Sequence, residues 1–432
     1  MKSQAVETEP LSGKLIAALT AATAIVYFFS NPEPQNFYDY TFRVAANMLG
    51  GNIGFTSKQP PWLNEFVLFE GFYNSVFPLG SVVSMMPIAL FKTLGLIKEM
   101  PGALIAATLA GIACFLLLKI ASRYDVENKK RILFSLAILF GTFTWTNLTF
   151  AGAWQLALGF AVVGELGAIY FTVFDRRPFV AGIFFATAFG NRTEILLTAP
   201  LFMYLLYPKE IYRRDAEMQS KNEKKSESLE IESTEISYPR RLGVSAVVSL
   251  AKFCAVPFVL GVATLTYNYV RFHSLTDFGY ARIPGVLEEP WYNHGIFSPR
   301  YIPGQAWEML LKLWNWKPNS PYLVPDGFSS SILLSSPFLL LALRAGANNG
   351  ALKVVSWASV AVLTLVLWMH GNSGGWQFGY RYAMVLLPWI FILLLESSKK
   401  RVTPVEWTLC IFSFVANAYA TWLFNWTEHV KQ

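Results

Sequence analysis

The chain contains about eleven apolar stretches whose lengths approach that of a bilayer-spanning helix, which takes about 20 residues. Hydrophobic residues make up 54% and charged residues 15% of the 432 residues, more apolar surface than a water-soluble fold of this length could bury. We therefore expect an all-α polytopic membrane protein. The predicted spans lie near 14–30, 102–121, 131–150, 154–174, 179–190, 194–207, 243–265, 329–343, 352–370, 382–396 and 405–424.

Lysine and arginine gather in segments between these spans, and basic loops are retained in the cytoplasm. These segments are 123–131, 176–177, 209–241, 344–353 and 399–401. The net charge of +7 is explained by such loops and does not indicate nucleic-acid binding. The segments 31–100, 266–328 and 370–382 then face outside. For this alternation to hold, 77–96 must lie as a helix at the outer membrane surface.

The same reading divides the chain into spans and loops. The predicted parts are a leader with a first, anchoring span (1–30), a first external loop with juxtamembrane helices (31–100), transmembrane helices (101–207), a charged cytoplasmic linker (208–242), a further span (243–265), a second large external loop (266–328), C-terminal spans (329–425) and an external tail (426–432). The three cysteines all fall within apolar runs, so their placement supports neither disulfides nor a thiolate metal site.

The first external loop begins with a carboxylate and a guanidinium at helical spacing. Asp39 follows the first span closely, and Arg43 comes four residues later, so on a helix the two share a face. A carboxylate at the edge of a low-dielectric region can act as a general base, and a guanidinium can bind phosphate. An ordinary salt bridge on a juxtamembrane helix explains the same spacing.

Three further stretches add to this picture. An aromatic and proline-containing stretch, 69–80, leads from the first loop back into the bilayer, and 267–280 opens the second loop. The segment 370–382 contains the pattern Trp-x-x-Gly-x-Arg-Tyr, from Trp376 to Tyr382. Together with the acidic residue Asp39, these stretches resemble the GT-C class of membrane glycosyltransferases, which includes the protein mannosyltransferase and aminoarabinose transferase types.

The resemblance implies a GT-C-like bundle that transfers a sugar from a polyprenyl-phosphate-linked donor to a glycan, lipid or protein acceptor. It places the site on the outer face of a membrane, which we take to be the plasma membrane of a prokaryote. Asp39 would be the general base, with Glu65 and Glu70 as further catalytic candidates. The candidates for binding the donor phosphate are Arg43, Arg192, His370 and Arg381, and those for binding sugar or acceptor are Tyr38, Trp62, Asp277, Trp376 and Tyr380.

Two features limit the chemistry. Arg192 lies in a polar break between apolar runs, where a charge is costly and marks a candidate site, although an ion pair with Glu194 or Glu165 explains it equally simply. Hard divalent cations need several oxygen ligands, and the external segments contain no paired acidic motif such as Asp-x-Asp. The four histidines lack metal-ligand spacing, so we expect no metal cofactor.

Two other functions remain open. The chain could transport or flip lipid-linked sugars, although its few deep charges disfavour ion-coupled transport. It could also be a non-catalytic assembly subunit that keeps the fold, because fold resemblance does not guarantee activity.

Overall fold

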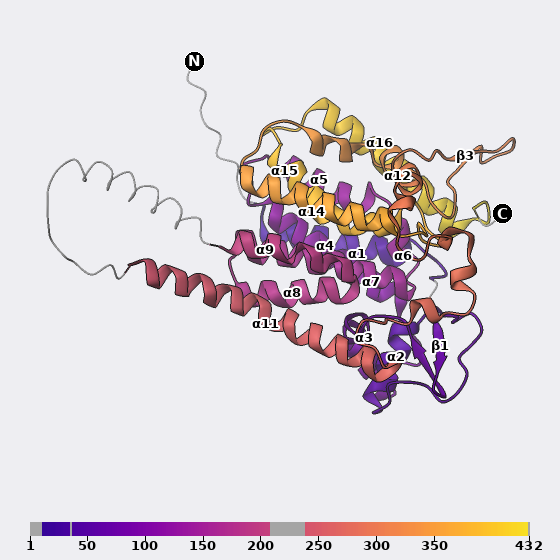
Figure 1. Cartoon of the computed structure of the whole chain (residues 1–432). Coiled ribbons are helices and arrows are strands. Elements are labelled where there is room, and N and C mark those ends of the chain that lie inside the picture. The colour runs from indigo at the N-terminus through magenta and orange to yellow at the C-terminus, as the bar shows by residue number, and fades with distance from the viewer. Residues whose placement is uncertain (1–10, 35–36, 208–237, 431–432) are drawn as a thin grey trace, which may run out of the picture.

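The computed structural model describes residues 11–34, 37–207 and 238–430, without the side chains of 238–245. The described chain is mostly helical, as predicted (Figure 1). The charged linker predicted at 208–242 lies outside the described residues, apart from the backbone of its last five.

Helices form most of the described chain, and the longest connections between them are 50–78, 273–301 and 311–331. The helices are α1 (Gly13–Phe29), α2 (Tyr40–Leu49), α3 (Leu79–Thr93), α4 (Gly102–Ala121), α5 (Asn128–Phe140), α6 (Thr144–Thr149), α7 (Ala153–Ile169), α8 (Pro178–Asn191), α9 (Ala199–Leu206), α11 (Tyr238–Phe272), α12 (Ile302–Leu310), α13 (Ile332–Ser335), α14 (Gly350–Met369), α15 (Leu387–Glu396) and α16 (Pro404–Trp426). A π-helical turn, Tyr170–Phe174, extends α7, and 3-10 segments occupy Thr193–Thr198, Pro337–Leu343 and Arg381–Leu386.

Within the described residues, five helices are long and apolar enough to cross a membrane. They are Gly102–Ala121, Ala153–Phe174, Ala246–Phe272, Gly350–Met369 and Pro404–Trp426, and they coincide with five predicted spans. Three shorter apolar helices, Gly13–Phe29, Pro178–Asn191 and Thr193–Leu206, coincide with three more. The structure is therefore compatible with a multi-pass membrane protein, but it does not confirm eleven transmembrane helices.

The remaining three predicted spans, 131–150, 329–343 and 382–396, are interrupted. Gly141 ends α5, and the hydroxyl of Thr142 then donates to the Ile138 carbonyl at 2.6 Å, which replaces a continuing helical bond. Pro337 starts a 3-10 segment after α13, and α15 likewise has a proline in its first turn. Proline lacks an N–H group and is favoured where a helix begins, so each apolar run is divided.

Two small hairpins depart from the predicted all-α fold. The strands β1 (Phe66–Phe69) and β2 (Phe72–Ser75) pair antiparallel in the first external loop, and β3 (Asn315–Trp316) pairs with β4 (Leu323–Val324) in the second. Gly71 has a φ of 84° in the first turn, a backbone conformation that glycine adopts without steric cost. The sequence did not indicate these strands, because they are short and contain aromatic residues, which are also common at membrane interfaces.

The loops predicted to face outside gather at one end of the bundle (Figure 1). There α2, α3 and β1 lie at the same end as β3 and the C-terminus. The Asn31 side-chain amide donates to the Thr149 carbonyl at 3.0 Å, which ties the first external segment to the bundle. The backbone N–H of Gln377 donates to the Gly327 carbonyl at 2.9 Å, which ties the third external segment to the second. Which end faces the cytoplasm stays a prediction from loop charge.

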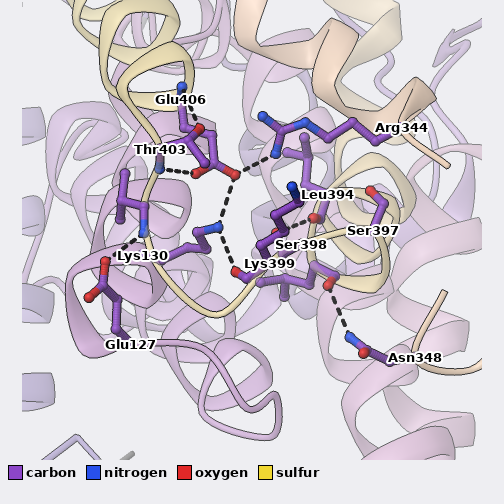
Figure 2. Close-up of polar contacts among 12 residues, drawn as sticks. Glu127, Lys130, Arg344, Asn348, Leu394, Ser397, Ser398, Lys399, Thr403 and Glu406 are labelled. Carbon is purple, nitrogen blue, oxygen red and sulfur yellow. Dashed lines mark hydrogen bonds and ion pairs between the residues drawn. The ribbon is translucent and has the colours of Figure 1, made fainter. Parts of the chain in front are cut away.

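The opposite end holds predicted cytoplasmic loops together through a buried ion cluster (Figure 2). The Glu406 carboxylate accepts from the Lys130 ammonium at 3.0 Å and also pairs with Arg344. Lys130 donates to the Lys399 carbonyl at 2.7 Å as well. Neither Lys130 nor Glu406 exposes any side-chain surface. Basic side chains from two predicted cytoplasmic loops, Lys130 and Arg344, therefore meet one carboxylate at the start of α16, and the backbone of a third loop accepts from Lys130.

Helix α3 covers most of the segment predicted to lie at the outer membrane surface. It packs against α2 and α8. Gly80 lies so close to Gly190 that a Cβ at position 80 would stand 2.3 Å from the Gly190 Cα atom. This contact fixes α3 at the C-terminal end of α8, but the position of α3 in a bilayer stays a prediction.

Candidate functional site

Trp154, in the first turn of α7, holds the first external loop against the bundle. Its indole N–H lies 3.0 Å from both carboxylate oxygens of Glu65. The rings of Tyr38 and Tyr40 lie 5.1 and 5.2 Å from the Trp154 ring. The Ala153 N–H also donates to the Tyr38 carbonyl at 2.9 Å. The segment that leads into α2 is thus packed directly on the residue that orients Glu65.

Glu65 lies just before β1 and is half-buried. Burial raises the pKa of its carboxyl to about 7, while the hydrogen bond from Trp154 and the positive charge of Arg381 act in the opposite direction. Desolvation penalises the ionised carboxylate, which is why burial has this sign. A carboxyl with a pKa near neutrality can accept and release a proton at physiological pH.

Arg381 supplies a buried positive charge near Glu65, because its guanidinium carbon lies 6.0 Å from the ring of Trp154, whose N–H donates to Glu65. The residue is 6% exposed, and no carboxylate of a described residue lies within ion-pair distance of its guanidinium. Its Nε has no hydrogen-bond partner among the described residues, and its Nη1 reaches the Trp376 carbonyl at only 3.4 Å. Buried charges are normally paired. The guanidinium is thus suited to bind an anion.

Arg192, His370 and Arg381 all lie around the ring of Tyr382. The Arg192 and Arg381 guanidinium carbons lie 4.6 and 5.2 Å from the centre of the Tyr382 ring, and the His370 ring lies 5.9 Å from it. Arg192 forms the ion pair with Glu194, at 2.7 Å, that the sequence left as an alternative. Burial lowers the pKa of His370; the hydrogen bond to the Asn372 backbone opposes this, and the charges of Arg192 and Arg381 lower the pKa further.

Asp39 lies next to this cluster but is bound to another partner. Arg43 contacts its carboxylate at 3.1 and 3.2 Å, which is the salt bridge that the spacing allowed. Burial raises the pKa of Asp39, and the charges of Arg43 and Lys92 oppose this. Arg381 thus acts electrostatically on Glu65, whereas Arg43 and Lys92 act on Asp39.

Two other predicted candidates lie at the surface. Glu70 is exposed at the β1–β2 turn, where its carboxylate lies 3.4 Å from the His273 ring. Trp62 is 53% exposed. A third, Asp277, pairs with Arg282 at 2.7 Å. The structure records no contact between these three side chains and Arg381.

The remaining two predicted sugar-binding residues pack inside the fold. The Trp376 ring lies 5.2 Å from the Phe424 ring. The Tyr380 hydroxyl donates to the Gln305 amide oxygen at 2.7 Å, and its side chain is fully buried. Both residues position the backbone that carries Arg381.

Three residues of the cluster were not singled out from the sequence as site residues. Trp154 stands at the start of a predicted span, and Tyr382 ends the Trp-x-x-Gly-x-Arg-Tyr pattern, so each carried a weak positional signal. Tyr280 ends the stretch 267–280 that opens the second loop; its ring lies 6.5 Å from the His370 ring, and it interacts electrostatically with Glu65.

Among the residues that the structure describes, no three His, Cys, Asp or Glu side chains are grouped so that they could hold a metal ion. Whether the protein works without a metal stays a prediction. No protein-family model, curated protein or solved structure matches the chain. Membership of the GT-C class therefore stays a prediction that depends on the residues quoted above.

Proposed function

We propose that this chain is a membrane glycosyltransferase that moves a sugar from a polyprenyl-phosphate-linked donor to an acceptor hydroxyl on the outer face of the membrane. One observation supports this most: Arg381 is a buried cation without a described ion-pair partner, beside a half-buried carboxyl, Glu65, that is poised near neutrality. The pair offers a phosphate-binding group and a proton acceptor in one place. Binding and base catalysis of this kind are what sugar transfer from a phosphodiester requires.

In this reaction the acceptor oxygen attacks the anomeric carbon of the donor sugar. The bond between that carbon and the phosphate oxygen breaks, and the electron pair leaves with the polyprenyl phosphate. The acceptor proton passes to the Glu65 carboxylate. Arg381 stabilises the negative charge that grows on the leaving phosphate, and a fixed donor in a low-dielectric site does so effectively.

The geometry favours Glu65 over Asp39 as the proton acceptor. The Asp39 carboxylate is held by Arg43 through contacts to both of its oxygens, so this group is already bound to a fixed cationic partner. Glu65 receives one N–H, from Trp154, and keeps lone pairs for an acceptor hydroxyl. In this proposal Asp39 positions the loop, and its earlier assignment as the base becomes the competing hypothesis.

The test uses the full chain in proteoliposomes with a panel of radiolabelled polyprenyl-phosphate hexoses and pentoses. Transfer is measured as release of polyprenyl phosphate and as label in added acceptors. We expect Glu65→Gln and Arg381→Gln to abolish transfer and Asp39→Asn to retain part of it. Matched controls are Glu99→Gln and Arg300→Gln, which change exposed residues of the external loops.

The outcomes separate the hypotheses. Loss of transfer in Asp39→Asn together with full activity in Glu65→Gln would return the base to Asp39. Movement of intact donor between leaflets, without cleavage, would instead indicate a transporter. Absence of both transfer and movement with every donor would favour a non-catalytic subunit.

A further inference from the structure

A groove lies between α1 and α4, far in sequence from the proposed active site. Its volume is about 540 Å³. Small residues of α1 form one wall, and the other wall is one face of α4. The lining residues are Gly13, Ile16, Ala17, Thr20, Ala21 and Ala24 of α1, and Thr108, Gly111, Ile112, Phe115 and Lys119 of α4. Ile112 and Phe115 are 40% and 43% exposed, so the groove opens to the outside of the bundle.

The groove is as long as one half of a bilayer is thick. The lining spans twelve residues of each helix, from 13 to 24 and from 108 to 119, and the rise of 1.5 Å per residue makes this length roughly 16 Å. The hydrocarbon core of a bilayer is about 30 Å thick. The groove therefore matches one acyl chain in one leaflet, whereas a transmembrane helix of another subunit would need a contact face about twice as long.

One end of the groove is positively charged and the rest is apolar. Lys119 lies in the last turn of α4, is half-buried, and lines the groove beside Gly13. Among the described residues, no carboxylate forms an ion pair with Lys119. Lys14, at the same end of α1, is exposed and adds a second positive charge. This end adjoins the loop 123–131, which carries the basic residues predicted to face the cytoplasm.

We propose that the groove binds one acyl chain of an anionic phospholipid, whose phosphate headgroup pairs with Lys119. The apolar lining holds the chain, and the lysine selects the headgroup by charge, because basic residues at a membrane surface attract anionic lipid. The bound lipid would fill the space that small side chains leave between α1 and α4. The site is separate from Arg381 and Glu65 and does not depend on the proposed activity.

The test uses the full chain in vesicles of phosphatidylcholine that contain a small fraction of phosphatidylglycerol. Either lipid carries a diazirine in its acyl chain, and the labelled residues are mapped by mass spectrometry after illumination. We expect the phosphatidylglycerol probe to label 13–24 and 108–119 several-fold more than the phosphatidylcholine probe. The exposed face of α11, where Phe258 is 71% exposed, is the reference for bulk lipid contact and should show no preference.

Variants distinguish a site from a generally lipid-exposed surface. Ala21→Phe fills the groove and should reduce its labelling several-fold, whereas Ala22→Phe, at an exposed neighbour outside the lining, should not. Lys119→Ala should remove the preference for phosphatidylglycerol, while Lys129→Ala, an exposed lysine in the adjoining loop, should keep it. Because Ala21→Phe could disturb α1, the lysine pair tests the proposal independently.

Equal labelling by both probes would overturn the proposal that the groove binds an anionic lipid. A preference for phosphatidylglycerol that is unchanged in Lys119→Ala would overturn it as well. So would a disulfide between two copies of an Ala21→Cys variant, since a second chain would then cover the groove.

Discussion

Replacing Trp154 with Phe should move the acid limb of the activity profile to higher pH. The indole N–H of Trp154 donates to Glu65 and lowers the pKa of that carboxyl, which burial has raised to about 7. A hydrogen bond to a charged group contributes about 1.5–3 kcal/mol, and 1.36 kcal/mol corresponds to one pKa unit. Water reaches the half-buried carboxyl and offsets part of this loss, so we expect a rise of about one pH unit.

The acid limb moves to higher pH because Glu65 acts as a base. The carboxylate must be ionised to accept a proton, so kcat/KM falls as the pH drops through the pKa of the free enzyme. The assay is the initial rate of donor cleavage in proteoliposomes between pH 5 and 9, a window set around the pKa of about 7. Trp145→Phe is the matched control, because the Trp145 indole donates to Ser30 instead. An acid limb that stays in place in Trp154→Phe, with activity retained, would refute the assignment of Glu65.

Three other substitutions test the site and the fold. Arg381→Lys should lower kcat/KM for the donor by about 10- to 100-fold, as expected for the loss of a bidentate contact to phosphate, whereas Arg300→Lys should not change it. Glu406→Gln should lower the free energy of unfolding by about 3–5 kcal/mol, because it leaves the buried Lys130 ammonium uncompensated; chemical denaturation would measure this. Gly80→Ala should cost about 1–3 kcal/mol and lower the Tm, since its Cβ would overlap Gly190.

The sequence predicted the helical class and the segregation of loops because both depend on composition and charge. Apolar runs need no tertiary information to be recognised, and basic loops mark one end of a bundle. The breaks at Gly141 and Pro337 were harder to predict, because glycine and proline are tolerated within transmembrane helices when neighbours satisfy the freed backbone groups. Whether such a residue bends a helix or ends it depends on the packing around it.

The sequence predicted which charged residues belong to the candidate site, but not which of them interact with each other. Asp39, Glu65 and Arg381 were all chosen as charged groups in the external segments. Local spacing paired Asp39 with Arg43, and the structure contains that ion pair. The interaction of Glu65 with Arg381 depends instead on Trp154, which donates to Glu65 and whose ring lies 6.0 Å from the Arg381 guanidinium carbon. Residues about 300 positions apart leave no periodic trace of such an interaction in one sequence.

Glu165 offers a further way to separate a glycosyltransferase from a transporter. It lies within α7 with no exposed surface; the Trp389 indole donates to one oxygen at 3.1 Å, and the other has no described partner. Glutamine keeps this shape and can accept the same hydrogen bond, so Glu165→Gln should leave both sugar transfer and the free energy of unfolding nearly unchanged. A carrier that couples transport to protons needs an ionisable group at such a depth. Loss of donor movement in Glu165→Gln, in vesicles where the wild-type chain moves donor without cleaving it, would therefore favour transport over transfer.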